Sequence, residues 1–381
     1  MSPLVIAGIV FVVTVLATAY FVVQVRELAV RVGLLGRVGA RHLAKAAVPR
    51  LGGVGIFLGF CLGVGLTFFL PVLRRPDETA KIALMLVGSL LIFAVMLADD
   101  LAELPALPRL LWQFAAAGFV VLPVLFDPIR PAAPWSLPNG ANGIIIDTVP
   151  NPFATFGGGL PAWLTGGSIV LPLLVAIPFT LVWIVGMANA INWIDGVDGL
   201  SGGVVCIACL VLFIHTTRLE QFTISLLPLV LGAAVLAFLR FNWHPSSIIM
   251  GDGGAMFLGY ALAVSAIIGG AKIATTLLVL IVPVLNMAWA ILVRLKRRTN
   301  PMEADDSHLH NALLRRGLSQ RQVTLLAYAV CVAFGVFALL ADRLLKLALF
   351  AAVAAALFAG LLLLAHQPPP DRDTPHGVPA D

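Results

Sequence analysis

Charged side chains are scarce in this sequence. Only 11% of its 381 residues are charged, whereas a soluble domain has roughly 25%. Hydrophobic residues make up 60% of the chain, and apolar stretches long enough for a helix of about 20 residues recur along it. The scarcity of charge therefore excludes an ordinary soluble enzyme and predicts an all-α, polytopic integral membrane protein.

Cysteine is also rare. The four cysteines all fall within apolar stretches, where they are expected to act as small apolar residues rather than as disulfides or metal ligands. The apolar stretches themselves predict about eleven transmembrane helices. Their ranges are 3–24, 52–71, 82–98, 110–126, 168–188, 200–217, 222–239, 254–271, 274–292, 322–341 and 347–366. Apolar residues cover all sides of these segments, which excludes the alternating strands of a membrane barrel.

The order of the segments predicts a single transmembrane domain over residues 1–366. Residues 127–167 form a loop rich in Pro, Gly and Asn, with a candidate short strand at 143–147, and residues 367–381 form a disordered tail. The first segment lacks the basic n-region of a signal peptide, and basic residues follow it, so the N-terminus is predicted to lie outside. Alternation from there puts two thirds of the 24 Lys and Arg residues inside and the 127–167 loop outside.

The few acidic residues gather where predicted spans meet the inside. Asp99 and Asp100 end the third span, Asp195 and Asp198 follow the fifth, and Asp252 precedes the eighth. Carboxylates from separate connections can thus converge at one membrane surface. Clustered carboxylates repel one another unless a cation neutralises them, and oxygen ligands without thiolates favour Mg²⁺, with Mn²⁺ as the alternative.

Two glycine-containing motifs surround these acids. In MANAINWIDGVDGL, Asn189, Asn192 and Asp195 follow one side of a helix, and the glycines allow a turn into the next span. The spacing does not fit a calcium loop. In IIMGDGG, glycines flank Asp252 just before an apolar helix, whose free amide donors are expected to face an anion.

Basic and histidine side chains complete the pattern. His308 and His310 are two residues apart, which places them on one side of an extended segment and does not fit a zinc protease. Together with Arg315 they would suit a diphosphate, and solvated loop histidines are the alternative. Arg50, in AVPRLGG, is the candidate binding residue at the start of the second span.

Taken in order, the motifs AVPRLGG, LADD, NAINWIDGVDGL, FNWHPSSIIMGDGG and DDSHLHNALLRRG resemble those of the polyprenyl-phosphate N-acetylhexosamine-1-phosphate transferase family. The resemblance covers residues 40 to 330. It implies transfer of a sugar-1-phosphate from a UDP-N-acetylhexosamine to a polyprenyl phosphate of the undecaprenyl type, with release of UMP. It also implies a multi-pass protein of the bacterial plasma membrane with a cytosolic active site that initiates cell-wall, teichoic-acid or lipopolysaccharide synthesis.

The resemblance assigns roles to residues of this chain. Asp252 and then Asp195 are the expected magnesium ligands. The expected catalytic residues are Asp99, Asp100, Asp195, Asp252 and His308. The expected substrate-binding residues are Arg50, Asn189, Asn192, Asp198, His310 and Arg315. The chain departs from the family pattern at Ala44 and Asn311, where close relatives have histidine.

Two other functions stay open at this point. PRLGG in place of TPTMGG favours a GlcNAc-1-phosphate transferase over the phospho-MurNAc-pentapeptide translocase of the same family. A membrane transporter is the alternative of a different class, although transporters place ionisable residues near the bilayer midplane. No basic and aromatic surface pattern indicates nucleic acid binding, and the oligomeric state is open, with a homodimer among the alternatives.

Overall fold

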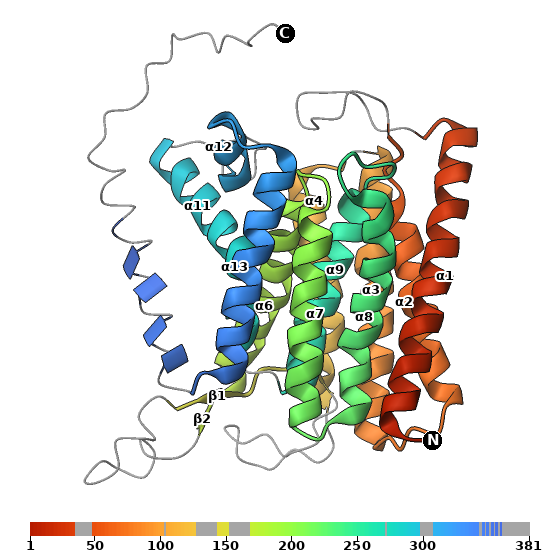
Figure 1. Ribbon diagram of the computed structural model, residues 1–381. Coiled ribbons are helices and arrows are strands. Elements are labelled where there is room, and N and C mark those ends of the chain that lie inside the picture. Colours follow the sequence, from red (N-terminus) through yellow and green to blue (C-terminus); the bar gives the residue numbers. More distant parts are fainter. Residues whose placement is uncertain are drawn as a thin grey trace, which may run out of the picture.

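The chain folds into a bundle of long helices (Figure 1). This computed structural model describes residues 1–34, 48–102, 104–126, 143–151, 168–270, 273–297, 308–342 and parts of 345–359. Nine helices of the described residues are long and apolar enough to cross a membrane. Eight of them are α1 (Pro3–Val32), α2 (Gly52–Phe69), α3 (Pro76–Ala102), α6 (Leu173–Ile194), α7 (Leu200–Arg218), α8 (Phe222–Asn242), α9 (Gly251–Ile268) and α13 (Gln320–Leu340). The ninth combines α4 (Ala106–Val121) with the 3-10 helix η1 (Leu122–Phe126).

The ninth predicted span, 274–292, is broken. It consists of α10 (Ile273–Val279) and α11 (Ile281–Arg297), whose axes differ by 81°. If this bent pair counts as one span, ten candidate spans coincide with the first ten predicted ranges. Most of the eleventh range, 347–366, and the whole predicted tail, 367–381, lie outside the described residues. The all-α polytopic fold is therefore confirmed.

Helix α9 lies at the centre of the bundle. Of its 18-residue apolar window, 83% is buried inside the protein, against 33% for α1 and for α13. It packs against α2, α3 and α6, and Phe257 makes edge contacts with Phe57 of α2 and Phe93 of α3. The start of α9 is consequently held on several sides, and this is where the sequence places Asp252.

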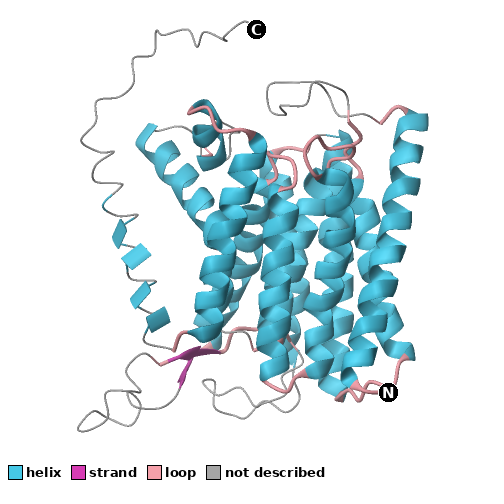
Figure 2. Ribbon diagram, viewed as in Figure 1, coloured by secondary structure: helices cyan, strands magenta, loops and turns pink. Residues whose placement is uncertain are grey.

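The two ends of the bundle differ. The N-terminus lies at the same end as a small antiparallel sheet of β1 (Thr148–Pro150) and β2 (Ser168–Val170), in which Thr148 pairs with Val170. Helix α12 (Leu309–Arg315) lies at the opposite end (Figures 1 and 2). The described part of the predicted outside loop is therefore on the N-terminal side, as its assignment requires.

The strand expected at 143–147 is not there. No strand is assigned to this segment. The Ile144 amide donates to the Val120 carbonyl at 2.8 Å, the Asp147 carbonyl accepts the Leu171 amide at 2.7 Å, and the strand begins at Thr148. Ile144 and Ile146 are buried in the core, and the Ile146 amide donates to the Thr180 hydroxyl of α6 at 3.0 Å. The apolar side chains of this segment are thus used to anchor the loop on the bundle and not to build a sheet.

Candidate active site at one end of the bundle

Asp100 holds the start of α9. Its two carboxylate oxygens accept hydrogen bonds from the backbone amides of Asp252 at 2.9 Å and Gly253 at 2.8 Å. Helix α3 continues to Ala102, so Asp99 and Asp100 lie in its last turn. The amides of Asp252 and Gly253 thus face an anion, as expected, but this anion is the carboxylate of Asp100 in the same chain.

Main-chain hydrogen bonds also hold the start of α9. The segment around Arg50 bonds to the segment before α9 through Ile249 N to Pro49 O at 2.8 Å, Gly52 N to Ile249 O at 2.9 Å and Gly53 N to Met250 O at 2.8 Å. A Cβ on Gly53 would lie 2.4 Å from the Gly254 Cα, so α2 and α9 approach backbone to backbone. Gly251 has φ +79°, a conformation that favours glycine.

Arg109, in the first turn of α4, pairs with two of the aspartates. Its guanidinium lies 3.0 Å from Asp99 and 3.7 Å from Asp252. Asp99 is buried and also accepts the Leu104 amide at 2.8 Å. Asp99 therefore stabilises the turn between α3 and α4 and positions Arg109. The Arg109 guanidinium in turn lies beside Asp252.

Asp195 caps the end of α6, and its carboxylate accepts a short hydrogen bond from the Ser201 hydroxyl. Burial raises the pKa of Asp195 to about 7, the Ser201 hydrogen bond opposes the rise, and the charges of Asp252 and Asp100 add to it. Arg50 acts on the same carboxylate in the opposite direction. The structure thus brings Asp100, Asp195, Asp252 and Arg50, from separate connections, into one electrostatically coupled cluster.

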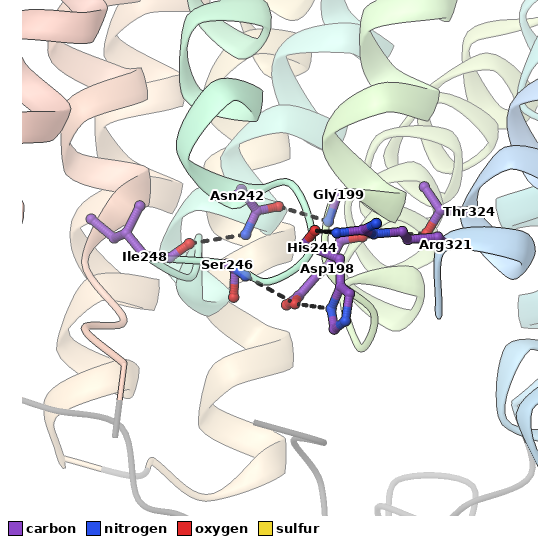
Figure 3. A network of polar contacts seen from close by, with 8 residues as sticks. All are labelled: Asp198, Gly199, Asn242, His244, Ser246, Ile248, Arg321 and Thr324. Carbon is purple, nitrogen blue, oxygen red and sulfur yellow. Dashed lines mark hydrogen bonds and ion pairs between the residues drawn. The ribbon is translucent and has the colours of Figure 1, made fainter. Parts of the chain in front are cut away.

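Asp198 lies in a neighbouring polar network (Figure 3). One of its carboxylate oxygens meets His244 Nδ1 at 2.8 Å and accepts the Ser246 amide at 3.1 Å. Its carbonyl oxygen accepts from Thr324 of α13, and Arg321 donates to the His244 carbonyl at 3.0 Å. The acidic turn after α6 is therefore tied both to the loop before α9 and to α13.

The two histidines form a stack with aromatic and cationic neighbours. The rings of His308 and His310 are parallel, with centroids 5.4 Å apart, and the Trp193 indole meets His308 edge to face at 5.9 Å. Arg294 lies over the Trp193 ring at 4.9 Å. A Cβ on Gly196 would lie 2.9 Å from His310 Nε2, so a glycine at 196 lets the imidazole reach the turn after α6.

His310 is buried and neutral. Its side chain belongs to a residue that is only 6% exposed, and burial, together with the neighbouring His308, lowers its pKa to about 3. The two rings lie on one side, as expected, because they stack on each other. The extended segment assumed for them is not there, since α12 begins at Leu309 and contains His310. Their contact with substrate stays a prediction.

The other predicted binding residues lie around this cluster. The Asn189 amide nitrogen donates to Gln113 Oε1 at 2.6 Å and to the Val185 carbonyl at 2.8 Å. Asn192 is half-buried on α6, one turn before Asp195, and Arg315 is exposed in the last turn of α12. Ala44 lies outside the described residues.

Sequence reasoning missed several side chains that shape the site. They are Arg109, Gln113, Ser201 and His244, which contact Asp99, Asn189, Asp195 and Asp198. In the sequence, Arg109 cannot be told from the other basic residues of inside-facing segments, and His244 lies in a loop without a distinguishing pattern. Gln113 carried a usable signal, since an amide inside an apolar span needs a hydrogen-bond partner.

The donor set suits a hard divalent cation. Within the described part of the chain, no group of three or more His, Cys, Asp or Glu side chains could hold a metal ion. Mg²⁺ is usually bound through one or two carboxylates plus substrate phosphates, so it does not need such a group. Asp195 and Asp252 supply carboxylate oxygens, and the charge of Asp252 acts on Asp195. A cation bound between them would relieve this repulsion. The residues present fit Mg²⁺.

Comparison with known proteins agrees with this geometry. Residues 82–270 match the model of glycosyl transferase family 4, a range that contains all five predicted aspartates. The chain is 28% identical over 335 residues to a Bacillus subtilis (strain 168) protein named "Probable undecaprenyl-phosphate N-acetylglucosaminyl 1-phosphate transferase", covering 86% of this chain and 83% of the relative. It is 29% identical to a Mycolicibacterium smegmatis decaprenyl-phosphate N-acetylglucosaminephosphotransferase, covering 85% of this chain and 79% of that protein.

A third relative comes from another branch. The phospho-N-acetylmuramoyl-pentapeptide-transferase of Streptococcus thermophilus is 30% identical over 272 residues, which cover 70% of this chain and 72% of the relative. The expected resemblance is therefore confirmed over most of this chain and most of each relative. Together with the acidic cluster at one end of the helix bundle, these similarities establish that the chain belongs to glycosyl transferase family 4.

Proposed function

We propose that this protein transfers N-acetylglucosamine-1-phosphate from a UDP-sugar to a polyprenyl phosphate of the undecaprenyl type, releasing UMP. The single observation that carries the proposal is the convergence of Asp100, Asp195 and Asp252 with Arg50 in a family member. The names of the Bacillus and Mycolicibacterium relatives, which combine a polyprenyl phosphate with N-acetylglucosamine phosphate, support the substrate class.

The position of the cluster supports a reaction at a membrane surface. The acids lie where helices end, at the end of the bundle opposite the N-terminus. The bias of basic residues supports a cytosolic location for this end, and the bacterial origin of the relatives supports a bacterial membrane. A soluble nucleotide sugar and a lipid acceptor can meet only where apolar helices reach water, so the site stands where both substrates have access.

Asp252 and Asp195 would hold a Mg²⁺ ion, which would supply positive charge to the diphosphate of the donor. The other residues do the positioning. Asp99 keeps Arg109 at 3.7 Å from Asp252, and Asp100 fixes the backbone that carries Asp252. Arg50 and Arg109 thus bring positive charge to the place where the diphosphate would lie. His308, His310 and Arg315 are the proposed ligands of further phosphate oxygens.

The chemistry is a phosphoryl transfer in which positioning and charge neutralisation dominate. An oxygen of the lipid phosphate attacks the β-phosphorus, a bond forms between them, and the bond from the β-phosphorus to the UMP oxygen breaks. A phosphate monoester has a second pKa of about 6, so the acceptor is mostly dianionic at neutral pH and needs no strong base. We therefore favour a single displacement without an aspartyl-phosphate intermediate.

One assay tests donor, acceptor and reaction together. Purified protein is incubated with Mg²⁺, undecaprenyl phosphate and a panel of UDP-sugars, and the lipid product is identified by mass. UDP-GlcNAc should give a lipid diphosphate sugar and stoichiometric UMP, and Asp252→Asn should abolish both. Product only from UDP-MurNAc-pentapeptide would favour the second candidate, which the Streptococcus relative supports. Substrate flux across vesicles without product would identify a transporter.

The displacement step has its own test. Radiolabelled UMP is incubated with UDP-GlcNAc and the protein in the absence of lipid phosphate. A single displacement gives no exchange of label into UDP-GlcNAc, because UMP leaves only when the acceptor attacks. Rapid exchange would overturn this part of the mechanism.

A further inference from the structure

Asn286 is a buried polar side chain in the middle of a predicted span. It lies in α11 just beyond the bend and is 1% exposed. Its Oδ1 accepts the Leu309 amide at 2.9 Å. Its Nδ2 lies 3.4 Å from the Trp193 carbonyl and 3.3 Å from His308 Nδ1. One amide therefore joins the end of α6, the middle of α11 and the start of α12.

These contacts determine which way the amide faces. A backbone N–H can only donate and a backbone carbonyl can only accept. The Leu309 amide therefore requires the Asn286 oxygen on its side, and the Trp193 carbonyl requires the nitrogen on the other. The side-chain NH₂ group must then be the part that faces His308.

The orientation of Asn286 fixes the proton on His308. Because an NH₂ group faces Nδ1, this nitrogen must be an acceptor, and the proton of the neutral ring lies on Nε2. The ring plane is held as well, by Trp193 at one edge and by the stacked His310. Among the described residues, Arg294 brings a positive charge over the Trp193 ring, and His310 is a titratable ring stacked on His308.

We propose that Asn286 is a positioning residue that holds His308 in the Nε2-protonated form, so that His308 serves as a hydrogen-bond donor to a phosphate oxygen and not as a base. This inference rests on the proposed function, because the phosphate belongs to the substrates assigned there. An Nε2–H donor is present whether the ring is neutral or charged.

The first test replaces the donor and keeps the acceptor. In Asn286→Asp a carboxylate oxygen still accepts the Leu309 amide, but the second oxygen now faces Nδ1. The neutral ring moves its proton to Nδ1, and Nε2 becomes an acceptor that repels phosphate. The ratio of kcat/KM between Asn286→Asp and the natural protein should fall about tenfold or more between about pH 6 and about pH 9. Thr14→Val, which removes a buried hydroxyl that donates to the Val10 carbonyl within α1, is the control and should keep a constant ratio.

The second test does not depend on the stability of that variant. In His308→Gln the amide nitrogen can reach the place of Nε2, whereas in His308→Asn it reaches only the place of Nδ1. The Gln variant should retain roughly tenfold more activity than the Asn variant if a donor at Nε2 is what the reaction needs. Melting temperature in detergent, measured for every variant, identifies loss of fold.

The outcomes separate the inference from the proposed function. A pH-independent ratio for a folded Asn286→Asp, or equal activities of His308→Gln and His308→Asn, would overturn the role of Asn286 while the natural protein remains an active transferase. A natural protein without UDP-sugar-dependent product would overturn the proposed function and, with it, the inference.

Discussion

The replacement Gly251→Ala would perturb the acidic cluster without changing any charge. Gly251 has φ +79°, and a Cβ there would lie 2.4 Å from the Arg50 carbonyl oxygen and 2.8 Å from the Asp100 carboxylate. The left-handed conformation alone costs an alanine about 1–2 kcal/mol. Weakening the two hydrogen bonds from the start of α9 to Asp100 adds about 1–3 kcal/mol.

These contributions predict two measurable effects. Stability should fall by about 2–5 kcal/mol if the backbone stays in place, and by less if the start of α9 relaxes. Relaxation moves Asp252, and a displacement of about 1 Å at a reacting centre can lower the rate roughly 100-fold. Activity should therefore fall in either case, and the fall should be larger when the loss of stability is smaller.

The assay is formation of lipid diphosphate sugar at fixed substrate, alongside a thermal unfolding curve in the same detergent. Gly65→Ala in α2 is the matched control, because its Cβ would meet nothing within 4 Å. That substitution should leave both readings unchanged or slightly raise stability, since alanine favours a helix over glycine by up to about 1 kcal/mol. If Gly251→Ala behaves like Gly65→Ala, the account of Asp100 as the anchor of α9 is wrong.

Three further predictions concern the neighbours of this anchor. Arg109→Leu leaves the buried Asp99 carboxylate without its ion pair and should destabilise the protein by about 1–3 kcal/mol, while adding Asp99→Asn should recover part of the loss in chemical unfolding. The pKa of Asp195 lies near 7 in the folded protein, above about 3.9 in an unfolded chain, so the folded state binds more protons in this interval. The melting temperature without divalent cations should therefore decrease from about pH 5 to about pH 8, and a flat profile that matches Asp195→Asn would contradict this electrostatic account. Gly196→Ala puts a Cβ 2.9 Å from His310 Nε2 and should reduce activity by displacing the ring, whereas Gly202→Ala, whose Cβ meets only ordinary contacts, should not; equal activities would show that the ring position is unimportant.

The fold was predictable because hydropathy acts over whole helices. Ten of the predicted ranges coincide with described candidate spans, since about 20 apolar residues can satisfy their backbone in a bilayer only as a helix. The bend of 81° between α10 and α11 was not predictable from hydropathy, because the two helices together read as one apolar span. Helix ends were also displaced, because α3 runs past Asp100 and α9 begins before Asp252.

The convergence of the acidic residues was predictable from the sequence, but the separate contacts that each of them makes were not. Their positions along the chain indicate one membrane surface, and the coupling of Asp195 with Asp100 and Asp252 agrees with it. Asp100 accepts hydrogen bonds from the amides of Asp252 and Gly253. These bonds depend on how α3 packs against α9, a contact between residues more than 150 positions apart in the sequence. The pairing of Asn286 with His308 is likewise a tertiary contact, which joins α11 to the residue before α12.

The backbone joint between residues 49–53 and 249–254 has a consequence for how this site tolerates sequence change. Its hydrogen bonds and its glycine-to-glycine approach involve no side chain, so the main chain, together with the Asp100 carboxylate, sets the position of Asp252. Side chains around the site can then be substituted while the Asp252 carboxylate stays in the same position. A protein built this way can present alanine at 44 and asparagine at 311 and still retain the acidic centre on which the chemistry depends.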